Sequence, residues 1–228
     1  MGILNLFGRE KAQAAIISDS KEAEGLKNIT SLDLDALKET ANIGTGNASI
    51  ALSNIFKKKV NITLPSVELS DSTQISRIIA GPDEMVVGIY SKIMEGMQGN
   101  ILTLMPIDSA LSIARLFVSR DINAKNMDEK DKQLLQKVGT AIYSSYLTSL
   151  AKFFEKKITF APPSVISTHG SQIHDFLLLH LGSDEKILVI KLGFDIDKTK
   201  IKGDFLLLFT YESLTPLLSN IHNKMGQH

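Results

Sequence analysis

The chain has 228 residues, 25 Lys and Arg against 25 Asp and Glu, and no cysteine. A chain of zero formal charge without a basic patch does not attract nucleic acid or an anionic membrane, so we expect neither as a partner. The lack of cysteine excludes disulfides, thiol catalysis and thiolate metal sites. The apolar runs are too short to span a membrane and the first residues lack a secretory signal, so we expect a cytoplasmic protein.

The first half of the chain predicts a mixed set of helices and strands. Residues 1–30 are weakly patterned and are expected to form an N-terminal extension or linker, with a docking peptide as the alternative. The regular pattern starts at residue 31. It predicts a helix over 33–57, a strand over 60–69, a short helix over 72–80, strands over 84–93 and 97–105, and a closing helix over 107–119.

The second half repeats this order. Its pattern predicts a helix over 129–156, strands over 157–168, 174–181, 186–193 and 202–210, and a closing helix over 212–222. We therefore expect residues 31–228 to form a single α+β domain of two repeats, about 31–120 and 127–222. Each repeat is an αββα-like unit, and the pseudo-two-fold pair would form one antiparallel-rich sheet covered by two long helices.

The repeat is visible residue by residue. Residues 37–67 align without a gap on residues 135–165, 98 positions later, and the alignment pairs Pro65 with Pro163. In the same register, the second copy has Gln133, Lys137 and Thr140 where the first copy has Asp35, Glu39 and Asn42. Only the first copy therefore carries an acid and an amide at these positions.

The spacing D-x3-E-x2-N-x22-P, formed by Asp35, Glu39, Asn42 and Pro65, is the main functional signal. At 100° per residue the first three lie on one stripe of the predicted helix, and its apolar residues lie opposite. A charged helix face is ordinarily just solvated surface, and by itself the stripe would be read that way.

The residues near the stripe argue against a plain surface. Asn42 is a poor helix former at mid-helix, and Gly44 and Gly46 each cost about 1 kcal/mol relative to alanine in a helix interior. We therefore expect a neighbouring group to approach this backbone closely. Gly44-Thr45-Gly46-Asn47 lacks the preceding strand and the lysine of a phosphate-binding loop, so close helix packing is the preferred interpretation.

An acid and an amide on one helix face suit the alignment of a water molecule. The amide of Asn42 both donates and accepts hydrogen bonds, so it can orient water, and Glu39 is placed to pair with a partner's cation. In-line attack of water on a phosphoryl group needs mainly alignment and electrostatic stabilisation from a protein. The stripe therefore favours phosphoryl hydrolysis.

This motif, repeated once in a chain of this length, resembles the CheC/CheX/FliY family of chemotaxis phosphatases, and in repeat length and order it is most similar to CheC. The resemblance covers about residues 30–222. It implies a hydrolase acting on the aspartyl phosphate of a CheY-like response regulator. In that reading Glu39 pairs with the response regulator's lysine and Asn42 aligns the hydrolytic water, while Asp35 and Pro65 shape and place the helix.

The resemblance also fixes the expected cofactors and partners. The chain should hold no metal or cofactor of its own, because the Mg²⁺ belongs to the response regulator. His169, His174 and His180 lack metal-ligand spacing and are expected to be ordinary surface or hydrogen-bonded histidines. The expected partners are a phosphorylated CheY-like response regulator and, as a further candidate, a CheD-like protein.

The second copy departs from the family pattern. Lys137 would meet the response regulator's lysine with like charge, and Thr140 offers a hydroxyl in place of an amide, so the second site (Gln133, Lys137, Thr140 and Pro163) is predicted to be inactive. Tyr143 and Tyr146 replace Thr45 and Ala48 of the first copy, and their bulk is expected to hinder a partner there.

Two other functions stay open. A non-enzymatic adaptor would bind a response regulator or a CheD-like protein with its chemistry partly lost, which the degenerate copy favours. A flagellar-switch or scaffold component would carry the stripe by chance. The intact acid and amide favour the enzyme.

Overall fold

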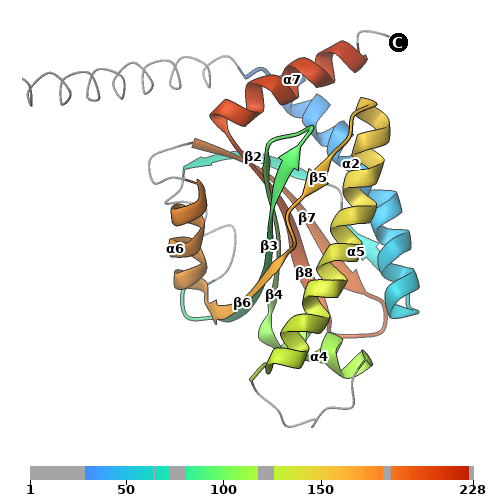
Figure 1. Ribbon diagram of the computed structural model, residues 1–228, viewed down its shortest axis with the longest axis vertical. Coiled ribbons are helices and arrows are strands. Elements are labelled where there is room, and N and C mark those ends of the chain that lie inside the picture. The colour runs from blue at the N-terminus through green and yellow to red at the C-terminus, as the bar shows by residue number, and fades with distance from the viewer. Residues whose placement is uncertain (1–28, 64, 72–80, 118–125, 182–185, 226–228) are drawn as a thin grey trace, which may run out of the picture.

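The computed structural model describes residues 29–63, 65–71, 81–117, 126–181 and 186–225, which form an eight-stranded sheet with helices on both faces (Figure 1). The strands are β1 (Val60–Ile62), β2 (Ser66–Asp71), β3 (Met85–Glu95), β4 (Gly99–Pro106), β5 (Thr159–Phe160), β6 (Ser164–His169), β7 (Lys186–Ile196) and β8 (Lys202–Thr210). The helices are α2 (Ser31–Phe56), α4 (Ile107–Phe117), α5 (Glu129–Phe154), α6 (Gly170–Leu181) and α7 (Tyr211–Met225). The predicted α+β fold class is confirmed.

The two halves of the chain exchange strands within the sheet. The order is β1-β7-β8-β4-β3-β5, with β2 also paired to β7 and β6 also paired to β3, and all pairs are antiparallel. The short strands of the first half thus pair with the hairpin of the second half, and the reverse holds for β5 and β6. The two hairpins meet at the β4–β8 pair, where Leu102 lies opposite Leu206.

The two long helices are built alike. Each has 26 residues and begins with a capping box, formed by Thr30 and Asp33 for α2 and by Asp128 and Asp131 for α5. In such a box each residue's side chain accepts a hydrogen bond from the other's backbone N–H, which satisfies donors that have no partner within the helix. The caps are 98 positions apart, like the aligned segments, so the sequence repeat extends to the helix starts.

The sheet separates two apolar cores. Along β3, Val87 and Ile89 pack into the core under α2 and α5, while Val86 and Tyr90 pack into the core under α6. This alternation follows from the two-residue period of a strand, and both sets are apolar because both faces are covered. The long helices lie on one side of the sheet and α6 on the other (Figure 1).

The strand predicted over 174–181 is wrong, because these residues belong to α6. Ile173, Leu177 and Leu181 are buried at four-residue spacing while Leu179 is 83% exposed, which is a helical pattern. The run Phe-Leu-Leu-Leu resembles a buried strand, and that resemblance misled the prediction. The repeat indicates the helix more clearly. The helix predicted over 72–80, moved by the repeat length of 98 positions, falls on 170–178, within α6. Residues 72–80 themselves lie outside the described part.

The long strands predicted over 60–69 and 157–168 are each two short strands. Pro65 lies between β1 and β2, and Pro162 and Pro163 lie between β5 and β6. Proline has no backbone N–H to donate to a ladder, so it interrupts the pairing. The other predicted elements match the observed ones within a few residues, and residues 1–28 and 118–125 lie outside the described part.

Candidate functional site

The acid and the amide of the motif lie on the outward face of α2. Asp35, Glu39 and Asn42 are all exposed, whereas Leu37 and Ala41 on the other side of the helix are buried in the core. The Nζ atom of Lys38 lies 3.6 Å from Oδ1 of Asp35, a surface ion pair that contributes little to stability. Within the described residues, no hydrogen bond or ion pair holds Glu39 or Asn42. Both side chains are therefore available to a partner.

Pro65 is not part of this helix face. It is half-buried and lies just before β2, where the first short strand has ended. The neighbouring strand β1 is tied to the C-terminal half of α2, because Ser49 Oγ donates to Val60 O at 2.7 Å and Val60 N donates to Ser53 Oγ at 3.0 Å. The structure thus places Asp35, Glu39 and Asn42 on one face of α2 and places Pro65 outside that face, at the break between β1 and β2.

The two glycines of α2 have different surroundings. A methyl group added at Gly44 would lie 2.4 Å from Cε2 of Tyr146, so this glycine is required by the packing of α2 against α5. A methyl group added at Gly46 would have no described atom within 4 Å, and this residue is exposed. The close approach expected from the sequence therefore occurs inside the molecule at Gly44, while the backbone at Gly46 is open to solvent.

Hydrogen bonds join α2 to α5 behind the exposed stripe. The hydroxyl of the buried Tyr146 donates to Ala41 O at 3.0 Å, Ser145 Oγ donates to Asn47 O at 3.1 Å, and Asn47 Nδ2 donates to Ser149 Oγ at 2.9 Å. Burial raises the pKa of Tyr146 well above its usual range, so the phenol stays protonated. These bonds to the backbone and side chains of α2 fix the helix that presents Glu39 and Asn42.

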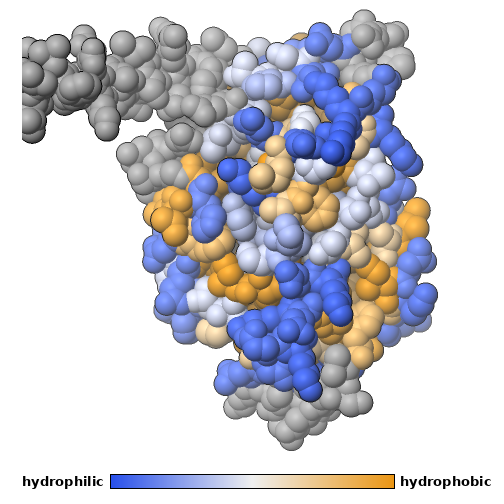
Figure 2. All heavy atoms as spheres, in the orientation of Figure 1, coloured by the Kyte–Doolittle hydropathy of each residue, from blue (hydrophilic) through white to orange (hydrophobic). Residues whose placement is uncertain are grey.

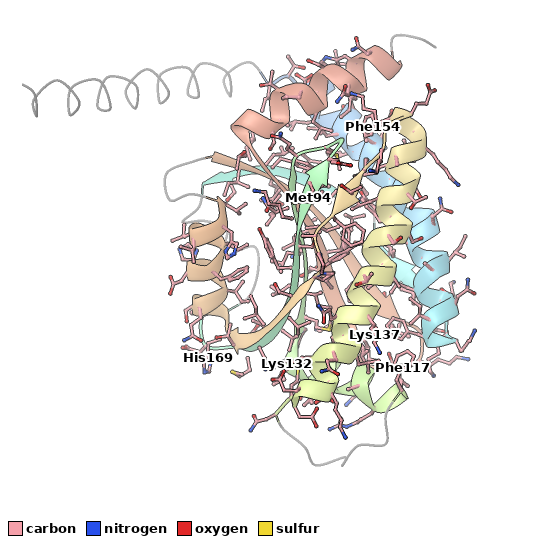
Figure 3. The ribbon with its side chains drawn as sticks, viewed as in Figure 1. Met94, Phe117, Lys132, Lys137, Phe154 and His169 are labelled. Carbon is pink, nitrogen blue, oxygen red and sulfur yellow. The ribbon has the colours of Figure 1, made fainter. Side chains whose placement is uncertain are left out.

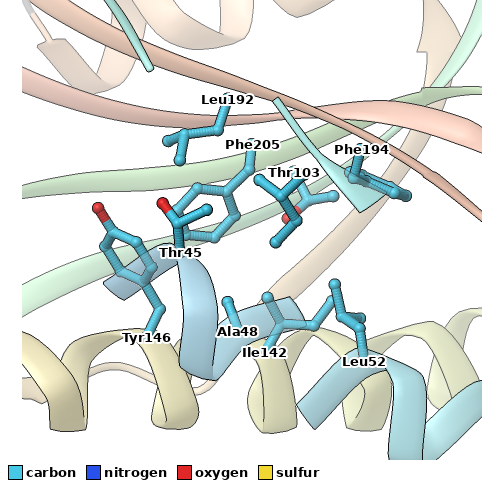
Figure 4. Close-up of a pocket in the computed structure, with 10 residues that line it drawn as sticks. Thr45, Ala48, Leu52, Thr103, Ile142, Tyr146, Leu192, Phe194 and Phe205 are labelled. Carbon is cyan, nitrogen blue, oxygen red and sulfur yellow. The ribbon is translucent and has the colours of Figure 1, made fainter. Parts of the chain in front are cut away.

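A small cavity lies between the two long helices and the sheet (Figure 4). Its volume is about 20 Å³, and its lining includes Ala48, Leu52, Ile142 and Phe205. Such a volume holds about one water molecule and no substrate. The chemistry offered by α2 is therefore on the surface of the protein and not in this cavity.

The corresponding face of α5 keeps the geometry but not the chemistry. Gln133, Lys137 and Thr140 are exposed, and Lys137 is seen on α5 in Figure 3. Thr140 Oγ1 donates to Gln136 O at 2.8 Å, and Gln136 Nε2 donates to the carbonyl of the buried Pro163 at 2.7 Å. The helix thus presents a cation and a hydroxyl that is already hydrogen-bonded to its own backbone.

The prediction that Tyr143 and Tyr146 obstruct the second face is wrong. Both side chains are buried, because they point from α5 toward the sheet and toward α2. The hydroxyl of Tyr143 donates to Ile89 O and accepts from Thr103 N, two residues that pair across β3 and β4. The alignment identified the positions of these tyrosines but not their direction, which depends on the packing of α5 on the sheet.

Comparison with known proteins agrees with this geometry. Residues 32–69, which contain all of α2 except its first residue and include the four motif positions, match the CheC-like family. The chain is 24% identical over 190 residues to the CheY-P phosphatase CheC of Bacillus subtilis, which is 81% of this chain and 91% of that protein. It is 30% identical over 149 residues to the Flagellar motor switch phosphatase FliY of the same organism, which is 64% of this chain but only 39% of that protein.

These similarities support the CheC/CheX/FliY family for this chain. The crystal structure of Thermotoga maritima FliY has the same fold, with a TM-score of 0.72 and 19% identity over 86% of this chain and 99% of that one. FliM from H. pylori, solved in a complex with FliG, also shares the fold, with a TM-score of 0.58 and 15% identity over 84% of this chain and 100% of that one.

Among the described residues of the chain, no three His, Asp or Glu side chains cluster in a way that could hold a metal ion. No described helix has the length and hydropathy needed to cross a membrane. His169 and His180 are exposed and each has a ring nitrogen near a backbone carbonyl, that of Asp83 and that of Phe176 respectively.

Proposed function

We propose that this chain hydrolyses the aspartyl phosphate of a CheY-like response regulator. The observation that carries the proposal is the pair of exposed side chains, Glu39 and Asn42, one turn apart on a helix held from behind by α5. Similarity to proteins named CheY-P phosphatase CheC and Flagellar motor switch phosphatase FliY supports the same substrate class. Such a substrate occurs in the cytoplasm, where we expect the protein to act.

Each side chain has one role in the proposed reaction. Glu39 pairs with a cation beside the phosphorylated aspartate and so docks the helix in the partner's active site. The amide of Asn42 holds a water molecule in line with the bond between phosphorus and the aspartyl oxygen. Water attacks phosphorus and that bond breaks. The products are inorganic phosphate, which keeps the water's oxygen, and the free aspartate carboxylate.

The remaining motif residues have supporting roles in this proposal. Asp35 pairs with Lys38 in the first turns of α2. Pro65 lies between β2 and β1, the strand that Ser49 and Ser53 bind to the helix. Neither needs to contact the phosphate. The reaction requires no metal from this chain, since the partner's own Mg²⁺ neutralises the phosphate.

Asn42→Ala tests the proposal. The variant should lose at least tenfold in the rate of phosphate release from a phosphorylated CheY-type protein, because one oriented hydrogen bond is worth more than about 1.4 kcal/mol in a transition state. Binding should persist, since Glu39 remains. Glu39→Ala should instead weaken binding as well as turnover. Near-normal turnover by Asn42→Ala in a single-turnover assay would rule out the water-orienting role.

The second candidate is an adaptor without catalysis. It is favoured by the α5 face, where Lys137 and Thr140 have replaced the acid and the amide, and by the likeness of the fold to FliM, which was solved bound to FliG. Such an adaptor would bind a response regulator or a CheD-like protein. An adaptor would leave the lifetime of the aspartyl phosphate unchanged, whereas a phosphatase would shorten it. The same phosphate-release assay therefore distinguishes the two functions.

A further inference from the structure

The outward face of α2 carries apolar side chains that the described part of the fold leaves exposed. Leu32 is 77% exposed, Ile43 37% and Ile50 62%, and all three lie on the same side of the helix as Glu39 and Asn42. Apolar atoms reach the surface over the C-terminal half of α2, at the edge of the molecule in Figure 2. Large exposed side chains of this kind, gathered on one face, indicate an interaction surface.

The repeat supplies an internal control for this observation. At the matching positions of α5 the chain has Lys130, Ala141 and Thr148, and no described residue of α5 is a large exposed hydrophobic. Both helices pack on the same sheet and begin and end alike, so the fold permits a hydrophilic outward face. Of the two long helices, only α2, which carries the acid and the amide, has large exposed apolar residues among those that the structure describes.

Gly46 adds independent evidence. It lies between Ile43 and Ile50 on the exposed face, has no described atom near its missing side chain, and costs about 1 kcal/mol relative to alanine in a helix interior. Gly44 is explained by Tyr146, but nothing within the described molecule explains Gly46. A glycine on an open helix surface permits another molecule to approach the backbone closely.

We propose that Ile43, Gly46 and Ile50 form an apolar seat for the response regulator that Glu39 and Asn42 act on. A partner patch of standard size is about 30 Å across, and Ile50 lies about 12 Å along the helix from Asn42. A protein that reaches Asn42 therefore also covers Gly46 and Ile50. The seat selects a partner with apolar side chains beside its phosphorylation site. The inference rests on the proposed function for the identity of the partner.

The test uses the full chain and a phosphorylated CheY-type response regulator. Ile50→Thr introduces the residue found at the matching position of α5 and keeps the β-branched shape. It should raise KM for dephosphorylation about tenfold and leave kcat nearly unchanged, because the seat contributes to binding and not to the reacting atoms. Leu179→Thr on α6 is the matched control, since Leu179 is also highly exposed but lies on the other side of the sheet. Its KM should equal that of the wild type.

Gly46→Ala separates docking from folding. The midpoint of thermal unfolding should rise by about 2–4 °C, because alanine is the better helix former and meets no atom of the described chain. The same variant should raise KM several-fold, because the added methyl group holds the partner away. If Gly46 had only a structural role, Gly46→Ala would not make the protein more stable and at the same time weaken its binding of the substrate.

The possible outcomes distinguish this inference from the proposed function. If the wild type accelerates phosphate release but Ile50→Thr and Gly46→Ala keep its KM, the seat is wrong and the proposed function stands. If the wild type has no activity, the proposed function fails. Binding of the beryllofluoride-activated response regulator then decides the seat: weaker binding by Ile50→Thr supports it, and equal binding overturns it. If Ile50→Thr changes only self-association in sedimentation, the occupant is a second copy and the proposal is overturned.

Discussion

At the scale of single residues, the two glycines of α2 show how one residue type can serve packing and function two positions apart. Gly44 lies against the ring of Tyr146, whose hydroxyl is bonded to the backbone of the same helix. Gly46 lies on the open side. Sequence alone flags both as costly in a helix, but only the packing of α5 shows which one the fold requires.

We expect Gly44→Ala to lower the free energy of unfolding by about 1–3 kcal/mol. The new methyl group would overlap Tyr146, which is held by its hydrogen bond and cannot swing away, so α2 and α5 must separate. Denaturant unfolding of the variant beside Gly46→Ala measures the difference. Equal stability of the two variants would contradict the close contact between α2 and α5 at Gly44 and Tyr146.

At the scale of elements, the start of α2 depends on a buried carboxylate. Asp33 Oδ2 accepts hydrogen bonds from the backbone N–H and the hydroxyl of Thr30, both at 2.7 Å, and Asp33 Oδ1 lies 2.7 Å from Nε2 of His222 on α7. Burial acts to raise the pKa of Asp33, but the bonds from Thr30 and the charge and hydrogen bond of His222 together lower it below its ordinary value of 3.8. This side chain therefore joins the first and last described helices.

The lowered pKa of Asp33 predicts a loss of stability in acid. The unfolded chain takes up this proton at a higher pH than the folded chain does, so the contribution is complete above about pH 4 and is lost as pH falls through the folded pKa. Asp33→Asn does not titrate and should be less stable near neutral pH by about 1 kcal/mol, the usual effect of a lost cap. Unfolding profiles of both proteins from pH 7 to 3 should converge in acid. A constant difference would contradict the assignment.

Several elements could be predicted from the sequence because their signals are local. The two long helices follow from apolar periodicity, and their equal spacing follows from the repeat. Helix α6 was missed because Phe176, Leu177 and Leu178 form a continuous apolar run, which fits a strand when neighbouring residues are ignored. The motif could place Glu39 and Asn42 on one exposed face, since a helix fixes that relation. The inward direction of Tyr143 and Tyr146 depends on contacts between distant segments and could not be predicted.

At the scale of the whole molecule, the exchange of strands ties the two halves together. That residues 31–228 form one cooperative domain stays a prediction, and the β4–β8 pair is where to test it. Leu102→Ala in β4 and Leu206→Ala in β8 each remove a fully buried side chain and should each cost about 2–5 kcal/mol. Each should lower the midpoint of one shared thermal transition by calorimetry. Two separate transitions, of which each variant lowers one, would show that the halves unfold independently.

The pseudo-symmetry of the molecule also makes the second face testable. Lys137→Ala and Thr140→Ala should leave phosphatase activity unchanged, because both side chains point to solvent from a helix whose site has lost its acid and amide. Since Tyr143 and Tyr146 are buried, they do not obstruct this face, and restoring its chemistry is a meaningful experiment. A loss of activity from Lys137→Ala alone would overturn the one-site mechanism and favour a second binding surface on α5.

The restored face provides the most demanding test. In an Asn42→Ala background, Gln133→Ser, Lys137→Glu and Thr140→Asn together should return measurable phosphate release from α5, because this helix has the same length as α2 and the same kind of cap at each end. The rescued enzyme should have a high KM, since α5 lacks the apolar seat. Adding Thr148→Ile should then lower KM with little change in kcat, the reverse of the Ile50→Thr effect on α2. If Thr148→Ile leaves KM unchanged in an otherwise active variant, apolar residues flanking the acid and the amide are not what seats the partner.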